Sequence, residues 1–456
     1  MVSLVRDGAI SPTELLEAHL RQIERRNPEI NAFTMVLGEQ ARHEARDREA
    51  ALVRGQPLGM LHGIPVTVKD SFDIAGLPTQ SGSRLRRGHR ASEDSWVVAR
   101  LRAEGAILLG KTNTPELLAN YETDNHVTGR TNHPRDPERT PGGSSGGEAA
   151  AIASYCSPGG VGSDGGGSIR VPAHFCGIAG LKPTPGRIPA TGHFPALGLP
   201  AGLLTAAGPM ARTALDLQLL FFILAGYDPE DPFSSPLPLR KPQPETPRAG
   251  VWEQFYEVPV DAEIQAAVRR AAALLADFGI PVEPFAPRGL ERAPNVWAFL
   301  FNQWPSAALC ELVKGREDEI HWTLRESLGV ADPSGHQVFT QLATRDRMRA
   351  TFLRQMQDIA VLIMPVCGIT AFHHRQRRYP VEDGEIGLFQ AMMPAVLANV
   401  LGLPAVTVPM AVSQAGMPIG IQMMGRPFEE ELLLELAVRL EEARGPLPFD
   451  PSEPVS

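Results

Sequence analysis

Two segments rich in glycine and serine contain the residues best suited to do chemistry. They read PGGSSGG at 141–147 and GSDGGGS at 162–168, and a predicted helix follows each, from Glu148 and from Ile169 onward. Because glycine has no side chain, a run of glycines lets backbone N–H groups come close to a ligand. Two such loops, each with serines and each opening a helix, indicate a functional site more strongly than a pair of ordinary flexible turns.

Three chemical interpretations of these segments compete. Phosphate binding is disfavoured, since PGGSSGG lacks the Lys-Ser/Thr pair that ends a P-loop. The stretch GGSSG at 142–146 fits the G-x-S-x-G nucleophile elbow, but an elbow needs an apolar strand before it, and 135–141 is polar with two prolines. The third interpretation is a serine nucleophile served by a base other than histidine. Ser168 then follows three glycines at a helix start, where N–H groups converging on one oxygen would form an oxyanion hole.

A serine nucleophile needs a base, and Lys69 is the candidate. It stands at the end of a predicted apolar strand, 64–68, and is followed by Asp70. A lone lysine is ordinarily an exposed surface residue. A lysine buried beside hydroxyl groups is different, because desolvation lowers its pKa from about 10.4 and lets the neutral amine act as a base.

The sequence predicts neither a metal site nor a disulfide. His373 and His374 are adjacent, but no His-Glu-x-x-His motif or third ligand accompanies them, so we assign them to a surface loop. No two cysteines are spaced as Cys-x-x-Cys, and we expect buried reduced thiols. The four cysteines are Cys156, Cys176, Cys310 and Cys367.

The pattern around these residues predicts an α/β fold, because short apolar strands alternate with capped helices. Ser11 opens a capping box with Glu14 and begins the first helix. Ser92 is predicted to cap a helix that runs through Glu104. The range 251–255 is predicted as a strand, and the apolar spacing in 261–278 predicts an amphipathic helix.

Two further ranges have unusual composition. Seven prolines fall within 229–247, which predicts an extended surface excursion. The range 386–425 is uncharged and long enough to span a bilayer, but four prolines interrupt it. We therefore interpret it as a buried helix, a turn and buried strands.

Charge and composition exclude several functional classes. The 456 residues include 43 Lys and Arg against 52 Asp and Glu, a net charge of −9. Such an acidic chain lacks the basic surface of a nucleic-acid-binding protein. The first twenty residues contain acidic side chains and no apolar core of a secretory signal, so a cytoplasmic protein without membrane segments is expected.

Several motifs together resemble the amidase signature family. They are PGGSSGGEAAAIAS, GVGSDGGGSIRVPAHFCGIAGLKPT, GIPVTVKDSFDIAGLPTQSGS, GKTNTPE and NVLGLPAVTVPM. The resemblance extends over about residues 5–445 and is loose in 288–386. It implies one domain, 1–456, with a large mixed β-sheet covered by helices on both faces. It also implies that 288–386 is the variable region that builds the substrate pocket.

The resemblance assigns a Ser–cisSer–Lys triad to this chain. Ser168 would be the nucleophile, Ser144 the bridging serine after a cis peptide, and Lys69 the base. Ser145 would support the site by hydrogen bonding, although an ordinary turn role explains it equally well. The reaction implied is hydrolysis of a carboxylic amide through an acyl-enzyme, without a metal or organic cofactor.

The same resemblance places the oxyanion hole on the glycines before Ser168. Arg170 is expected to pair with Asp164 and brace this loop. The family motif commonly has Thr or Ile where this chain has Gly165, so a looser loop or a wider mouth is expected. The hole would be formed by Gly165, Gly166 and Gly167.

The substrate is less well specified than the reaction. We expect a small neutral amide, apolar or aryl, and esters and carbamates remain open. Four aromatic residues in the variable region either pack in the core or line the pocket. The alternative function is the amidase subunit of a tRNA-dependent amidotransferase, which would need partner subunits; homo-oligomerisation is also left open. The aromatic residues are Trp297, Phe299, Phe301 and Trp304.

Overall fold

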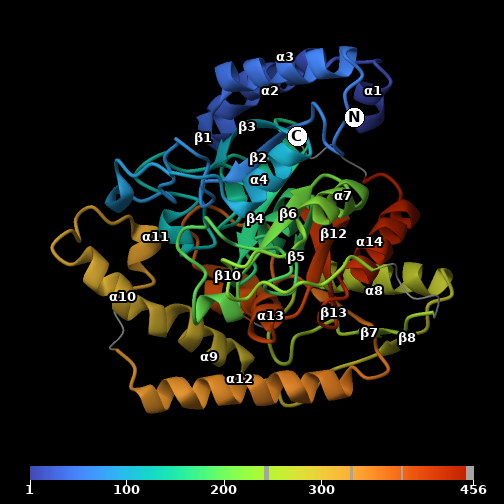
Figure 1. The fold of residues 1–456 in the computed structure, drawn as a ribbon. Coiled ribbons are helices and arrows are strands. Elements are labelled where there is room, and N and C mark those ends of the chain that lie inside the picture. The colour runs from blue at the N-terminus through green and yellow to red at the C-terminus, as the bar shows by residue number, and fades with distance from the viewer. Residues whose placement is uncertain (241–245, 329–331, 382–383, 448–456) are drawn as a thin grey trace.

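The computed structural model describes residues 1–240, 246–328, 332–381 and 384–447, and an eleven-stranded sheet runs through its centre (Figure 1). A separate two-stranded sheet pairs β10 (Arg378–Val381) with β11 (Gly384–Gly387). In spatial order the large sheet contains β1 (Phe33–Val36), β3 (Ile107–Thr112), β2 (Pro65–Lys69), β4 (Gly159–Asp164), β6 (Ala206–Ala211), β5 (Ala179–Lys182), β12 (Ala405–Val412), β13 (Pro418–Gly425), β9 (Val361–Pro365), β7 (Ala249–Val251) and β8 (Val282–Pro284).

The strand directions make this a mixed sheet. Strand β2 runs parallel to both β3 and β4, and β7 runs parallel to β8 and β9. The pairs from β4 to β9 through the middle of the sheet are antiparallel. The predicted large mixed sheet is therefore confirmed.

Helices cover both faces of the sheet, as expected. The α-helices of the described residues are α1 (Val2–Arg6), α2 (Pro12–Ile30), α3 (Gly38–Val53), α4 (Trp96–Ala103), α5 (Gly146–Ala153), α6 (Arg170–Cys176), α7 (Ala214–Leu224), α8 (Ala262–Asp277), α9 (Ala293–Trp297), α10 (Trp304–Val313), α11 (Trp322–Arg325), α12 (Gly335–Gln355), α13 (Leu388–Val400) and α14 (Glu430–Arg444).

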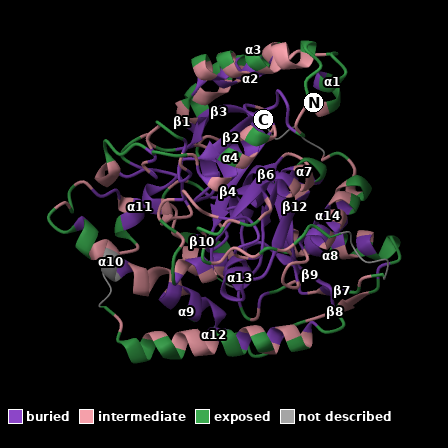
Figure 2. Cartoon of the chain, in the orientation of Figure 1, coloured by how far each residue is buried: buried purple, intermediate pink, exposed green. Residues whose placement is uncertain are grey.

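The alternation of side chains along each strand separates the two faces. In β9, Val361 and Ile363 pack in one core with α4, α7, α8 and α14, whereas Leu362 and Met364 pack in a second core with α9, α12 and α13. Helices α5 and α6 lie on this second face. Figure 2 shows the strands at the centre of the molecule buried, while α12 lies at the periphery with much of its surface exposed. All residues of α5 and α6 are buried.

Local signals predicted some elements well and others badly. The Ser11 capping box is present, and α8 begins after Asp261 as expected. The helix predicted to run from Ser92 through Glu104 is present, but its predicted start is wrong, since α4 begins only after Ser95. Asp94 instead accepts a hydrogen bond from Ala75 N and pairs with Arg102.

The strand predicted at 251–255 is also wrong. Strand β7 ends at Val251, and a last hydrogen bond to β9 is donated by Trp252 N to Ile363 O; residues 253–255 are not paired in the sheet. Trp252, Phe255 and Tyr256 there pack their rings against one another at centroid distances of 4.9–5.2 Å. Aromatic packing therefore ends this strand earlier than its composition indicates.

The proline-rich range 229–247 contains no helix or strand in its described part, 229–240 and 246–247; 241–245 lie outside the described residues. Three cysteines are buried and all four are free thiols, but Cys310 is only half-buried, contrary to expectation. Among the described residues, no helix combines the length and apolarity required to cross a bilayer. The range 386–425 forms α13, β12 and β13, as predicted.

The sheet brings the chemistry-bearing segments to one edge. Because β2 and β4 run parallel, their carboxyl ends lie side by side. Lys69 is the last residue of β2, and Asp164 is the last residue of β4. The GGGS turn follows immediately, so the fold places Ser168 near Lys69.

Candidate active site

Lys69 is fully buried beside two serines. Val66 and Val68 face the first core, so the alternation along β2 turns Thr67 and Lys69 towards the face that carries α5. The Lys69 Nζ atom lies 2.7 Å from Ser144 Oγ, 3.1 Å from Ser163 Oγ and 3.3 Å from Ser163 O. The structure therefore brings together the predicted base and the predicted bridging serine.

Burial lowers the pKa of Lys69 to about 7, although the nearby carboxylates of Asp164 and Glu148 act to raise it. Glu148, on α5, is fully buried too, and burial raises its pKa to about 7 against the hydrogen bonds donated by Thr67 and Thr112. A neutral amine at Lys69 is thus accessible near neutral pH, which a general base requires.

The two serines of the first loop lie next to this lysine. The Gly143–Ser144 peptide is cis, in agreement with the resemblance. Ser145 precedes α5, and its N–H donates to Ser168 O at 3.1 Å. Its hydroxyl also lies 3.3 Å from Ser163 O and 3.4 Å from Ser163 N. Ser145 therefore ties the first loop to β4 and to the turn that carries Ser168.

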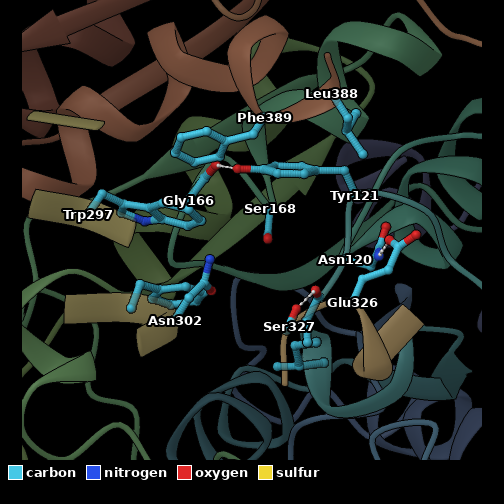
Figure 3. Close-up of a pocket in the computed structure, with 13 residues that line it drawn as sticks. Asn120, Tyr121, Gly166, Ser168, Trp297, Asn302, Glu326, Ser327, Leu388 and Phe389 are labelled. Carbon is cyan, nitrogen blue, oxygen red and sulfur yellow. Dashed lines mark hydrogen bonds between the residues drawn. The ribbon is translucent and has the colours of Figure 1, made fainter. Parts of the chain in front are cut away.

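Ser168 is more exposed than the other serines of the site. Its side chain is half-buried, whereas the side chains of Ser144 and Ser145 are buried. Within the described residues its Oγ makes no hydrogen bond, so it is not joined to Ser144 here. Figure 3 shows its hydroxyl pointing into the middle of a pocket, between Tyr121 and Trp297.

Two aromatic side chains hold the turn before Ser168. Trp297 Nε1 donates to Gly165 O at 2.7 Å, and Tyr121 OH donates to Gly166 O at 2.7 Å. In a trans peptide the carbonyl oxygen and the following N–H point in opposite directions. The bond from Trp297 therefore directs the Gly166 N–H away from the Trp297 ring.

The glycine turn differs from the expected hole at one residue. The Gly167 N–H donates to Asp164 Oδ1 at 2.7 Å and is not available to a substrate. Among the described residues, the N–H groups of Gly165, Gly166 and Ser168 have no partner, and these are the available donors. Gly167 is constrained sterically, since its φ is +107° and a Cβ there would lie 2.8 Å from Ala395 Cβ.

The expected looser rim at Gly165 is also not found. A side chain at this position would overlap the Phe301 ring, and one at Gly166 would overlap Trp297. Trp297 and Phe301 stack with centroids 5.0 Å apart. The two rings occupy the space that a larger residue in the motif would take.

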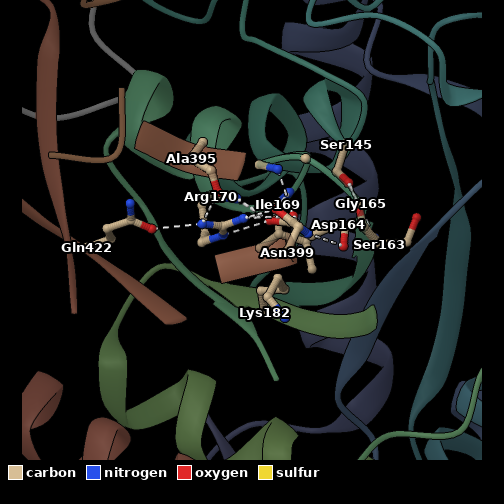
Figure 4. A network of polar contacts seen from close by, with 12 residues as sticks. Ser145, Ser163, Asp164, Gly165, Ile169, Arg170, Lys182, Ala395, Asn399 and Gln422 are labelled. Atoms are coloured by element: carbon tan, nitrogen blue, oxygen red, sulfur yellow. Dashed lines mark hydrogen bonds and ion pairs between the residues drawn. The ribbon is translucent and has the colours of Figure 1, made fainter. Parts of the chain in front are cut away.

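Asp164 and Arg170 form a buried network beneath the turn (Figure 4). Asp164 accepts from the N–H groups of Gly167, Ile169 and Arg170 and pairs with the Arg170 guanidinium at 2.9 Å. Arg170 also donates to Asn399. Burial alone would raise the pKa of Asp164, but Arg170 outweighs it and holds that pKa well below its usual range. The carboxylate thus fixes the turn.

Two cavities meet at Ser168. The larger, about 560 Å³, is lined by Ser144, Ser163, Ser168 and several leucines. The smaller, about 120 Å³, is lined by Tyr121, Trp297 and Ser168 among others. A carbonyl group held at Ser168 would have one substituent in each cavity.

The aromatic residues left open by the sequence divide between two environments. Trp297, Phe301 and Trp304 line the cavities, whereas Phe299 packs in the second core. Trp297 belongs to both environments. It joins the core through α9 and reaches the glycine turn with its indole N–H.

The adjacent histidines His373 and His374 lie in different surroundings. His373 is exposed, and His374 lies 3.2 Å from Pro137 O and 3.7 Å from Glu122. Over the described ranges, no three His, Cys, Asp or Glu side chains are placed to hold an ion together.

Sequence reasoning missed three residues of this site. Tyr121 contacts the glycine turn and Ser163 contacts Lys69. His193 contacts Ser163 and lines the larger cavity. Ser163 lies inside the quoted GSDGGGS segment, which was the available signal. Nothing in the pattern around Tyr121 or His193 indicates their position.

Replacing Trp297 with phenylalanine should slow the reaction without emptying the core. The ring still stacks on Phe301, but Gly165 O loses its donor and the neighbouring N–H groups lose their fixed direction. We expect kcat to fall about 10- to 100-fold, since a misplaced oxyanion donor is costly. Steady-state kinetics measure it, with Trp252→Phe in the same core as the matched control. Equal kinetics in the two variants would contradict this role.

Comparisons with known proteins agree with this geometry. Residues 14–434 match the model of the Amidase family. The chain therefore belongs to the amidase signature family, whose members hydrolyse amides.

Three relatives illustrate the range of the family. Indoleacetamide hydrolase of Bradyrhizobium diazoefficiens is 33% identical over 453 residues, covering 97% of this chain and 85% of that protein. One subunit of the glutamyl-tRNA(Gln) amidotransferase of Anaeromyxobacter dehalogenans is 33% identical over 480 residues, covering 97% and 95%. The solved structure of 6-aminohexanoate cyclic dimer hydrolase with its substrate is 32% identical, has a TM-score of 0.87, and covers 99% and 97%.

Proposed function

We propose that this chain hydrolyses a carboxylic amide through an acyl-enzyme formed on Ser168, with Ser144 and Lys69 moving the proton. The observation that supports this most directly is the 2.7 Å contact between Lys69 Nζ and Ser144 Oγ beside a half-buried Ser168. Membership of the amidase signature family supports the same chemistry.

In the proposed reaction, neutral Lys69 takes a proton from Ser144, and Ser144 takes one from Ser168. The Ser168 oxygen then attacks the carbonyl carbon. The negative charge that develops on the carbonyl oxygen meets the N–H groups of Gly165, Gly166 and Ser168. The proton returns through Ser144 to the leaving amine, and water cleaves the acyl-enzyme by the same steps.

The supporting residues act on position rather than on protons. Asp164 holds three N–H groups of the turn, and Arg170 keeps Asp164 ionised. Ser145 joins the Ser168 carbonyl to the first loop. These contacts support a turn that is already shaped for the transition state before substrate arrives.

We propose a neutral substrate with an apolar or aryl group. The larger cavity is lined mainly by aliphatic and aromatic side chains, some from the variable region 288–386 and others from 117–119 and 195–201. The net charge of −9 disfavours a polyanionic substrate. The leucines that line the larger cavity are Leu117, Leu118, Leu197, Leu199, Leu309 and Leu312.

A panel of nitroanilides with lengthening acyl chains tests this specificity. Each added methylene that enters the apolar cavity contributes about 0.8 kcal/mol, so kcat/KM should rise about fourfold per step. Small primary amides such as acetamide are the comparison. If acetamide exceeds the anilides by tenfold or more, about 1.4 kcal/mol of transition-state binding, the apolar-pocket proposal is wrong.

The second candidate is the amidase subunit of a tRNA-dependent amidotransferase, which the similarity to such subunits favours. An enzyme of that kind needs partner subunits. Affinity purification from the native host separates the candidates. A second chain in fixed ratio, with no turnover of simple amides by the isolated protein, would favour the amidotransferase. Turnover by the isolated protein would favour the amidase.

A further inference from the structure

A histidine that belongs to none of the motifs is hydrogen-bonded to the serine beside Lys69. His193 lies in the loop after β5, where it is buried and packs edge-on against Phe72. Its Nδ1 lies 2.7 Å from Pro195 O, and its Nε2 lies 2.9 Å from Ser163 Oγ. Ser163 Oγ in turn lies 3.1 Å from Lys69 Nζ. A continuous chain of hydrogen bonds therefore joins His193 to the general base.

The direction of each bond follows from the atoms available. A carbonyl oxygen only accepts, so His193 Nδ1 carries a proton and donates to Pro195 O. Burial lowers the pKa of His193 to about 3, which keeps the ring neutral and leaves Nε2 as an acceptor. The Ser163 hydroxyl must then donate its proton to His193. Its oxygen can only accept from Lys69.

The same count of hydrogen-bond donors and acceptors fixes the orientation of the Lys69 amine. A neutral amine has two N–H groups and one lone pair, and Lys69 Nζ has three partners. Ser163 Oγ and Ser163 O both accept, so they take the two N–H groups. The lone pair remains for Ser144, whose hydroxyl proton is directed to it at 2.7 Å. This is the direction that proton removal from Ser144 requires.

We propose that His193 is a positioning residue that acts through Ser163 to turn the lone pair of Lys69 towards Ser144. The inference rests on the function proposed above. With no acceptor at position 193, the Ser163 hydroxyl is free to donate to the Lys69 lone pair and to compete with Ser144 for it. His193 thereby excludes the unproductive arrangement.

Other charged groups near Lys69 affect its protonation but do not determine the direction of its lone pair. Asp164 on β4 and Glu148 on α5 both favour the ammonium form. Neither makes a hydrogen bond with Lys69 within the described residues; Glu148 accepts from Thr67 and Thr112 instead. The direction of the lone pair is therefore set by the serines.

His193→Leu and His193→Gln form the test pair. Both lose the bond to Pro195, but the glutamine oxygen can still accept from Ser163. We expect His193→Leu to lower kcat about 10- to 100-fold with little change in KM. The acidic limb of its pH–activity profile, where activity falls as Lys69 gains a proton, should move to lower pH. The freed Ser163 hydroxyl then donates to the Lys69 lone pair and so stabilises the neutral amine. His193→Gln should keep both values near those of the wild type.

His62→Leu is the matched control, because His62 is also buried and also bonded to a backbone carbonyl, that of Arg48. It should leave kcat and the acidic limb unchanged. The wild type and Ser168→Ala are assayed alongside, so that failure of the proposed function, a Ser168→Ala enzyme that still turns over, is seen separately.

Ser163→Ala supplies a second measurement if His193→Leu fails to fold. It removes one of the two acceptors for Lys69, the Ser163 hydroxyl, and leaves the backbone carbonyl, so kcat should fall and the acidic limb should again move to lower pH. His193→Leu/Ser163→Ala should lose no more activity than Ser163→Ala alone, because His193 acts only through Ser163. Additive losses, an acidic limb that moves to higher pH, or wild-type kinetics in His193→Leu would each overturn the proposal.

Discussion

Replacing Ser168 with alanine is expected to abolish amide turnover while the protein stays folded. The substitution removes the one oxygen proposed to attack the carbonyl, and loss of a nucleophile lowers kcat on the order of 10⁴-fold or more. The fold should tolerate it, since Ser168 Oγ makes no hydrogen bond among the described residues and is half-buried. Thermal unfolding should show a midpoint close to that of the wild type.

Covalent labelling makes this prediction specific to one residue. A serine-directed fluorophosphonate should modify the wild type once, and peptide mapping should locate the label on Ser168. Ser154→Ala is the matched control, because Ser154 Oγ is buried at the far end of α5 and has no hydrogen-bond partner among the described residues. Ser154→Ala should be labelled, and should hydrolyse amides, as the wild type does. A label that maps to Ser144, or that persists in Ser168→Ala, would restore the nucleophile-elbow interpretation.

The catalytic turn could be predicted because short motifs specify it. The spacing within GSDGGGSIR places Asp164 and Arg170 six residues apart across a tight turn, and the structure pairs them. The resemblance likewise placed Ser144 beside Lys69, and the two are in contact. Contacts of this kind are encoded in the motif itself.

Contacts made by unpatterned loops could not be predicted. His193 reaches Ser163 only because its loop passes beside the residues that follow β2, where Phe194 N donates to Ser71 O. Trp297 was recognised as one of an aromatic group, but its bond to Gly165 depends on how α9 packs beneath the turn. The bond from the Gly167 N–H to Asp164 depends on the φ and ψ of the turn, which the motif does not specify. The sequence alone therefore places this N–H in the oxyanion hole.

The same distinction holds for secondary structure. The Ser11 capping box is a local arrangement, and the helix begins where it indicates. The helix start predicted at Ser92 and the strand predicted at 251–255 have local signals too, but tertiary partners override them. Asp94 bonds to Ala75 N, and Trp252 joins an aromatic cluster. The mixed sheet itself followed from the resemblance rather than from the pattern of strands.

Replacing Lys69 with alanine should remove most amide hydrolysis, on the order of 10²- to 10⁴-fold in kcat. The loss should be larger for anilides than for activated esters of the same acyl group. An amine leaves only after it receives a proton, which the proposed relay from Lys69 supplies, whereas a nitrophenolate leaves without one. Equal losses on the two substrates would mean that Lys69 only shapes the site.

The pH profile identifies which group must lose its proton. In the described part of the chain, three buried groups have pKa values shifted to about 7: Lys69, Lys182 and Glu148. Only Lys69 contacts Ser144, whereas Lys182 Nζ bonds to Pro183 O. Lys182→Met, the matched control for a buried lysine, should therefore keep the acidic limb of the wild type.

The sign of the pH dependence follows from the role of Lys69. Below about pH 7 the side chain is an ammonium without a lone pair, so the active fraction should fall about tenfold for each further pH unit. Glu148→Gln removes a carboxylate that stabilises this ammonium, and its acidic limb should move to lower pH. The residual esterase activity of Lys69→Ala should be flat from pH 6 to about pH 8. An acidic limb that survives in Lys69→Ala would assign the titration to Glu148 or Lys182 and remove the lysine from the proton relay.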